Sequence, residues 1–165
     1  MRPLLAMLLL LAATAGAQSP AGPCAAPENA QFDFWLGTWE VHAQGRLAGH
    51  STITRIHGGC TLLEEYTAAG GPYEGKSFNW YDPGAGRWHQ VWVDNGGTRL
   101  NLAGGLVDGS MVLTGDRRVG DGSVADRITW TPHEDGTVRQ HWEQSDDGGG
   151  TWTTLFDGLY RKVAE

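Results

Sequence analysis

The sequence has few stretches that are both long enough for a helix and free of helix-breaking residues. It contains 25 glycines and 7 prolines in 165 residues. Beyond residue 28, the longest segment without either residue is Thr137–Asp147, which has eleven residues. Because an average helix has about 11–12 residues, a helical bundle is excluded. The segments between glycines are short and rich in Val, Ile, Thr, Trp and Tyr, which is typical of an all-β protein.

Long apolar runs are also scarce, and the one that is present lies at the start. Leu4–Ala13 is almost entirely apolar, follows Arg2 and precedes the small residues Ala15–Ala17. The run is too short to span a bilayer core of about 30 Å, and its flanks are typical of a secretory signal peptide. We therefore predict a signal peptide over residues 1–17, an extended lead-in over 18–28 and one domain over 29–165. The protein is expected to be exported, either to the periplasm or into the medium.

Cysteine is limited to Cys24 and Cys60. Their separation lacks the C-x-x-C spacing of most redox and metal pairs. In an exported chain such a pair is most simply a disulfide, here closing a loop of about 36 residues. A redox or metal pair is the competing interpretation.

Basic residues are outnumbered by acidic ones. The chain has 12 Lys and Arg against 19 Asp and Glu, and a formal net charge of −7. An acidic domain repels phosphate backbones and anionic lipid. We therefore expect no nucleic-acid partner and, once the signal peptide is removed, no membrane association. The sequence indicates no particular cofactor and does not predict the oligomeric state.

The apolar and β-branched runs predict about ten strands joined by tight hairpins. Turn sequences such as Asp94–Gly97 and Glu134–Gly136 separate them, with Gly, Asn and Asp at the positions that need positive φ. Sequential hairpins form a meander, whose edges are removed by closure into an up-and-down barrel. A short helical turn near Asn29 should precede the first strand. The predicted strands are Trp39–Gln44, Ser51–His57, Thr61–Ala68, Lys76–Tyr81, Trp88–Asp94, Arg99–Ala103, Ser110–Asp116, Ala125–Thr131, Val138–Gln144 and Trp152–Val163.

Two motifs near the ends of the predicted domain resemble those of the calycin superfamily, which includes lipocalins and fatty-acid-binding proteins. Phe32–Trp39 reads F-D-F-W-L-G-T-W and contains G-x-W, and Phe156–Arg161 reads F-D-G-L-Y-R. The resemblance implies that Trp39 packs against Arg161 and closes the base of the barrel, where a guanidinium on an indole gains cation–π energy. The whole pattern is similar to a family of exported bacterial proteins of unassigned function, so it implies no activity.

The chain departs from two calycin subgroups. Fatty-acid-binding proteins carry a helical lid between their first two strands, whereas only residues 43–50 are available here. Nitrobindin-like haem barrels use a proximal histidine near the C-terminus, but the last histidine of this chain is His141. We therefore expect neither a lid nor that type of haem site.

One motif points toward a different class and is interpreted as structural. Ser145–Trp152 matches S-x-D-x-G-x-T-W, the Asp-box of sialidases and other propellers. A propeller needs several blades of about 40 residues, which this chain cannot supply. The Asp-box is instead expected to stabilise a hairpin, with Ser and Asp side chains bonding the turn amides.

A group of aromatic and amide side chains on the predicted strands forms the candidate ligand site. Aromatic walls with a few polar groups are typical of a pocket for a small molecule. The alternative is that the eight tryptophans fill the core, and the alternation of Trp88–Asp94 does not reveal which face points inward. The candidate ligand-binding residues are Trp80, Trp88, Gln90, Trp92, Gln140 and Trp142. We thus expect a binding barrel, rather than an enzyme, for a small hydrophobic or aromatic ligand.

Three other functions stay open. His89 and His141 lie on predicted strands and would reach haem iron or a metal if they pointed inward, although no metal-ligand spacing is present. Glu64 and Glu65 fall on opposite faces of one strand, so that one of them would face the interior and serve a hydrolase or isomerase, with His141 or Arg139 opposite it. A structural or partner-binding barrel with a filled core is the third. We assign no catalytic and no metal-binding residue.

Overall fold

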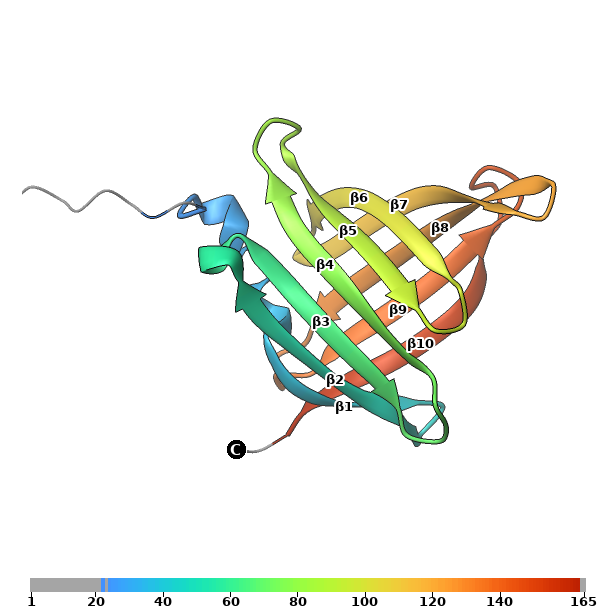
Figure 1. Cartoon of the computed structure of the whole chain (residues 1–165), viewed down its shortest axis with the longest axis horizontal. Helices are drawn as coiled ribbons and strands as arrows, with labels where there is room; N and C mark the ends of the chain where they lie inside the picture. Colours follow the sequence, from blue (N-terminus) through green and yellow to red (C-terminus); the bar gives the residue numbers. More distant parts are fainter. Residues whose placement is uncertain (1–21, 23, 164–165) are drawn as a thin grey trace, which may run out of the picture.

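The computed structural model describes residues 22 and 24–163, which form ten antiparallel strands in a closed barrel (Figure 1). The strand order follows the sequence around the barrel, and β1 closes the ring by pairing with β10. This confirms the predicted up-and-down barrel. The strands are β1 Gly37–Ala43, β2 Arg46–Ile56, β3 Thr61–Ala68, β4 Glu74–Asp82, β5 Arg87–Asp94, β6 Arg99–Val107, β7 Ser110–Val119, β8 Gly122–Pro132, β9 Val138–Ser145 and β10 Thr153–Lys162.

The predicted signal peptide (1–17) and residues 18–21 and 23 of the predicted lead-in lie outside the described residues. No helix in the described part of the chain has the length and apolar character needed to cross a membrane.

Several strands are longer than the sequence predicted, most clearly β2. The turn between β1 and β2 consists of Gln44 and Gly45, which both have positive φ (51° and 75°). Such two-residue turns match the twist of paired strands. Gln-Gly is a weaker turn signal than Asn-Gly or Asp-Gly, so the sequence does not reveal that β2 begins at Arg46. β10 runs unbroken through Gly158.

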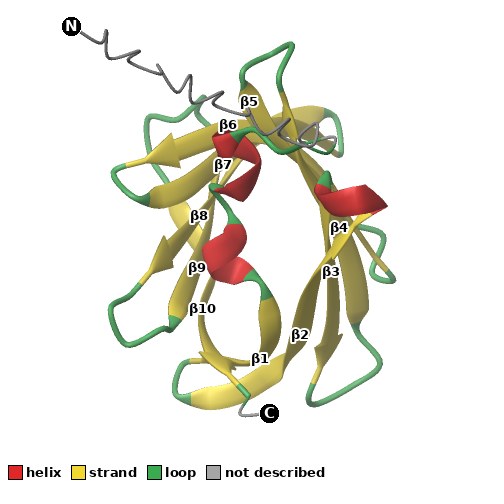
Figure 2. Cartoon of the chain, turned by 90° about the vertical axis from the view of Figure 1, so that its left-hand side faces the viewer, coloured by secondary structure: helices red, strands yellow, loops and turns green. Residues whose placement is uncertain are grey.

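One end of the barrel is filled by aromatic side chains, and we call it the closed end. Two short 3-10 helices, η1 (Pro27–Ala30) and η2 (Asp33–Trp35), lie at this end inside the ring of strands (Figure 2). Phe32 and Trp35 stack at 4.9 Å and are fully buried, and both rings pack against Trp130. The F-D-F-W-L-G-T-W motif is therefore an aromatic plug. The short helical turn predicted near Asn29 is present as η1, and η2 forms a second single turn after it.

The predicted pair of Trp39 and Arg161 is wrong by one residue. Trp39 is fully buried and its Nε1 donates to the carbonyl of Trp35 at 2.9 Å. The cation over its ring is Lys162, whose Nζ lies 5.2 Å from the ring centroid. The register pairs Trp39 with Lys162 and places the exposed Arg161 opposite Glu40. A shift of one residue moves a side chain to the other face of a strand.

Two ties fasten the plug to the rim of the barrel. The predicted disulfide between Cys24 and Cys60 is present and joins the lead-in to the 3-10 turn η3 (His57–Gly59) that precedes β3. Arg55 on β2 donates to the carbonyls of Asn29 and Gly59 and pairs with Asp33. Arg55 thus links η1 and η2 to the turn η3 beside Cys60. No motif in the sequence indicates this role.

The Asp-box is a hairpin device, as predicted. The Oγ of Ser145 accepts from the backbone N–H of Gly149 at 2.8 Å, and Asp147 accepts from the backbone and side chain of Thr151. Hydrogen bonds from the backbone and side chain of Thr151 and from Ser145 lower the pKa of Asp147 to about 2. The motif therefore shapes the turn between β9 and β10.

Candidate functional site

The inward face of β5 decides which predicted residues reach the barrel interior. Trp88, Gln90 and Trp92 point inward, whereas His89 and Val93 lie on the outer face. The same alternation on β9 turns Gln140 and Trp142 inward.

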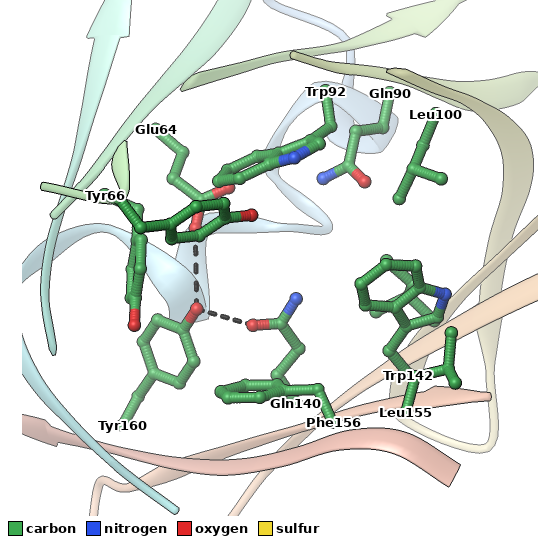
Figure 3. Close-up of a pocket in the computed structure, with 12 residues that line it drawn as sticks. Glu64, Tyr66, Gln90, Trp92, Leu100, Gln140, Trp142, Leu155, Phe156 and Tyr160 are labelled. Atoms are coloured by element: carbon green, nitrogen blue, oxygen red, sulfur yellow. Dashed lines mark hydrogen bonds between the residues drawn. The ribbon is translucent and has the colours of Figure 1, made fainter. Parts of the chain in front are cut away.

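A cavity of about 190 Å³ occupies the half of the barrel away from the plug (Figure 3). It lies near the hairpins at residues 69–73 and 146–152, and its lining residues Tyr73 and Leu155 are exposed. The interior is thus filled at one end and hollow at the other, so both of the alternatives for the tryptophans apply. The cavity is lined by Glu64, Tyr66, Tyr73, Gln90, Trp92, Leu100, Ile128, Gln140, Trp142, Leu155, Phe156 and Tyr160.

Four of the six predicted site residues line the cavity, namely Gln90, Trp92, Gln140 and Trp142. Trp88 is buried in the closed end, where it packs edge-on against Phe32. Trp80 does not face the interior at all. It stacks at 5.3 Å on His89, its cross-strand partner on the outer face. The prediction was wrong for Trp80. The inward positions of β4 are Ser77 and Asn79, so the next residue, Trp80, points outward.

Buried polar side chains form one wall of the cavity. Glu64 on β3 is only 3% exposed, and its carboxylate accepts from Ser77 Oγ at 2.8 Å and Ser51 Oγ at 3.2 Å. Asn79 donates to the same Ser77 Oγ at 2.9 Å, and Gln90 Nε2 donates to Asn79 Oδ1 at 2.8 Å. A continuous hydrogen-bonded chain therefore runs across β2, β3, β4 and β5.

Tyr160 extends this chain to the opposite side of the barrel. Its hydroxyl donates to Gln140 Oε1 at 2.5 Å and lies 3.4 Å from Glu64 Oε1 (Figure 3). The hydroxyl has one proton, and the shorter contact uses it. The donation to Glu64 Oε1 is therefore the weaker of the two.

The environment of Glu64 favours its neutral form. Burial raises the pKa of Glu64 from 4.5 to about 7, although hydrogen bonds from Ser77, Ser51 and Tyr160 lower it in part. The described residues that line the cavity include no Lys, Arg or His to balance the charge. An isolated buried carboxylate takes up a proton when no cation is near.

Two amide groups face the cavity with unused hydrogen-bonding capacity. Gln90 uses its amide nitrogen within the polar wall, and Gln140 uses its carbonyl oxygen. Among the described residues, no hydrogen bond involves Gln90 Oε1 or Gln140 Nε2, and both amides point toward the hollow region in Figure 3. The site thus presents an acceptor, a donor and a carboxyl group beside aromatic surfaces.

Three aromatic rings of the cavity lie close to glycines, two of them on a neighbouring strand and one on the same strand. A Cβ on Gly75 would lie 2.2 Å from Trp92 Cζ2, and one on Gly49 would lie 2.5 Å from the Tyr66 hydroxyl. A Cβ on Gly158 would lie 2.4 Å from Phe156 Cε1. These glycines are therefore required by close approach of a ring, and they fix where the aromatic walls stand.

Two carboxylates hold the indoles of the cavity walls. Asp94 accepts from Trp92 Nε1 at 2.9 Å and from the Tyr73 hydroxyl at 2.8 Å. Burial alone would raise the pKa of Asp94, but hydrogen bonds from Trp92, Thr98, Tyr73 and Gly96 outweigh it and lower the pKa. Asp126 accepts from Trp142 Nε1 at 2.8 Å and pairs with Arg117. Both indoles are thus fixed by a hydrogen bond as well as by packing.

Some lining residues were not predicted from the sequence. β10 contains a register shift between Thr154 and Phe156, and this bulge brings both Leu155 and Phe156 to the cavity. Tyr66 and Tyr160 follow the inward alternation of Glu64 and Gly158, so the pattern would have identified them once the inward face was known. Ser51 and Ser77 also occupy inward positions of their strands, where they contact Glu64.

The structure places both candidate haem or metal ligands on the outer face of the barrel. His89 stacks on Trp80, and His141 contacts Thr154 and lies 3.6 Å from Glu143. Neither lines the cavity, so the idea of an internal iron or metal bound by them is wrong. No cluster of three or more His, Cys, Asp or Glu suited to a metal occurs within residues 22 and 24–163.

The two glutamates face opposite sides, as their alternation predicted. Glu65 is exposed and pairs with Lys76, whereas Glu64 faces the cavity. The partners of Glu64 are Ser51, Ser77 and Tyr160, not His141 or Arg139 as proposed for an acid–base pair. A glycosidase needs two carboxylates on one cleft, and Glu64 is the one carboxylate among the described residues that line this cavity.

Comparison with known proteins does not assign a family: no protein-family model matches the chain, and no curated protein matches it. The closed ten-strand antiparallel barrel is consistent with a calycin-like fold. The presence of the Cys24–Cys60 disulfide indicates an oxidising compartment outside the cytoplasm.

Proposed function

We propose that this protein is an exported, calycin-like barrel that binds a small, partly apolar molecule in the cavity beside Glu64. The carrying observation is that buried aromatic side chains fill the barrel around its plug, yet about 190 Å³ is left between aromatic walls and a polar wall. A core whose only role is structural fills its interior, since each void of methyl size costs stability.

The size and chemistry of the cavity limit the ligand class. An apolar cavity of about 150 Å³ holds benzene, so a cavity of about 190 Å³ suits a ring with one polar substituent. Trp92, Trp142 and Phe156 offer apolar faces, while Gln90 and Gln140 offer an unused acceptor and donor. A molecule of seven or so non-hydrogen atoms is expected to bind with a dissociation constant on the order of 0.1–1 mM.

Isothermal titration calorimetry with phenol, cyclohexanol and hexan-1-ol tests the proposal. Leu100→Phe places extra volume in the cavity and should weaken binding by at least tenfold. Val93→Phe adds the same ring to the exposed outer face of β5 and should leave binding unchanged. Thermal melting of both variants establishes that they fold.

Equal binding by wild type and Leu100→Phe would show that the probes bind elsewhere. Absence of binding for every probe at millimolar concentration would contradict the proposed function.

A further inference from the structure

The proposed function leaves open which polar group the ligand carries, and the side chains around Glu64 bear on that question. Glu64 is buried, lines the cavity and has no salt-bridge partner among the described residues. Ser51 and Ser77 donate to it, but hydroxyl groups do not neutralise a charge. The cavity therefore holds a carboxyl group whose natural complement, a cation, is not supplied by its lining residues.

The rest of the cavity also favours a positive ligand. Gln90 Oε1 is an unused acceptor. The Ser77 hydroxyl bridges Gln90 and the Glu64 carboxylate, since its Oγ lies 2.8 Å from Glu64 Oε2 and 3.5 Å from Gln90 Nε2. The faces of Tyr66, Trp92 and Trp142 border the same space, and aromatic faces attract ammonium groups.

The charge near the open side of the cavity is negative, which favours a cationic ligand. Asp94 holds Trp92 and Tyr73 and is kept ionised by its hydrogen bonds. Asp126 faces the interior but is neutralised by Arg117. The net charge of the whole chain is −7. Acidic surroundings raise the local concentration of a cation.

We infer that the ligand is a small organic amine, bound with its ammonium group on the Glu64 carboxylate and its apolar body against the rings of Trp92, Trp142 and Tyr66. This inference rests on the proposed function and names the ligand class of the same site. On binding, Glu64 must be ionised, so that below neutral pH the neutral carboxyl group first releases its proton to solvent.

The titration of Glu64 makes binding dependent on pH. The titratable groups that face it are Tyr66 on its own strand and Tyr160 on β10, and burial raises the pKa of both phenols, so neither titrates near neutrality. Ser51 on β2 and Ser77 on β4 do not titrate. Because burial raises the pKa of Glu64 to about 7, the ionised fraction falls about tenfold between pH 8 and pH 6.

Cyclohexylamine and cyclohexanol form a matched pair of probes, since they differ only in the polar group on the same ring. An alkyl ammonium group titrates near pH 10, so the amine stays charged from pH 6 to pH 8. At pH 8, the wild-type protein should bind the amine at least tenfold more tightly than the alcohol. Lowering the pH to 6 should weaken binding of the amine about tenfold and leave binding of the alcohol unchanged.

Two variants locate the effect. Glu64→Gln should remove both the preference for the amine and its pH dependence, while cyclohexanol binding confirms that the cavity persists. Glu65→Gln, on the outer face of the same strand, should behave like the wild type.

The outcomes separate this inference from the proposed function. If cyclohexanol binds and cyclohexylamine binds no more tightly, the amine class is wrong and a neutral ligand is indicated. If the preference survives in Glu64→Gln, the amine is bound by another group, and the inference is overturned. If neither probe binds, both proposals fail.

Discussion

At the scale of single residues, the adjacent Glu64 and Glu65 show how pointing to opposite faces of a strand gives the same side chain different environments. Glu65 is exposed and paired with Lys76, so it stabilises the folded state weakly at most. Glu64 is buried among hydroxyl groups and amides, and its pKa is raised to about 7. The sequence predicted that one of the two would point inward but did not identify which, because both faces of its strand carry residues suited to packing.

The raised pKa of Glu64 should make stability fall as pH rises. In the unfolded chain Glu64 loses its proton near pH 4.5, whereas in the folded protein it keeps the proton until about pH 7. The unfolded state therefore binds fewer protons between these values, and stability declines through this window by about 3 kcal/mol in total. Urea unfolding should show that the effect of Glu64→Gln changes by about 2–3 kcal/mol between pH 5 and pH 8.

Glu65→Gln is the control for that measurement and should show no such change. The account of Glu64 would be refuted if the stability difference between wild type and Glu64→Gln were the same at both pH values.

At the closed end, the sequence motif identified the buried tryptophan but not the cation that lies over its ring. The G-x-W motif correctly located the buried Trp39, because its sequence signature is local. Its cationic neighbour depends on the register between β1 and β10, and a local motif does not determine that register to a single residue. The motif alone therefore selected Arg161 where the structure has Lys162.

Truncations at the closed end should have unequal effects. Trp39→Ala removes a fully buried indole and should destabilise the protein by about 3–5 kcal/mol. Arg161→Ala removes an exposed side chain and should change stability by less than about 0.5 kcal/mol. Chemical denaturation measures both, and comparable losses for the two variants would restore the pairing predicted from the motif.

At the scale of the elements, glycines decide where the aromatic walls stand. The strand pattern and the hairpin residues predicted all ten strands, since alternation and turn chemistry are local properties. Phe156 lies against Gly158 of its own strand, whereas Tyr66 and Trp92 lie against Gly49 and Gly75 of neighbouring strands. Without the register, these glycines look like any others in a glycine-rich chain.

A methyl group at Gly75 should disturb the wall formed by Trp92. The new Cβ would lie 2.2 Å from the indole, so the ring or the strand must move, at a cost of about 1–3 kcal/mol. Gly105 lies on β6 with no atom within 4 Å of an added Cβ, so Gly105→Ala is a matched control. Thermal melting should show a loss for Gly75→Ala and no loss for Gly105→Ala.

Equal melting temperatures for Gly75→Ala and the wild type would show that Trp92 is not held by this contact. The same variant should also weaken binding of cyclohexanol, because Trp92 lines the cavity.

At the scale of the whole molecule, the barrel divides into a plugged half and a hollow half. Phe32, Trp35, Trp88 and Trp130 fill the first, and the Cys24–Cys60 disulfide and Arg55 fasten the plug to the rim. The second contains the cavity beside Glu64. Composition and the sequential hairpins predicted the closed barrel. The division into halves depends on where the tryptophans lie along the strands, and this requires the three-dimensional register.

This division allows one spectrum to test whether the cavity is the binding site. Each tryptophan has one indole N–H, and the eight fall into separate environments: Trp92 and Trp142 line the cavity, Trp35, Trp39, Trp88 and Trp130 lie in the closed end, and Trp80 and Trp152 lie outside the barrel interior. Titration of ¹⁵N-labelled protein with phenol should move the Trp92 and Trp142 signals along saturable curves with a common dissociation constant. The Trp80 and Trp152 signals should stay in place. Eight unchanged signals, or movement confined to Trp80 and Trp152, would contradict a ligand site inside the barrel.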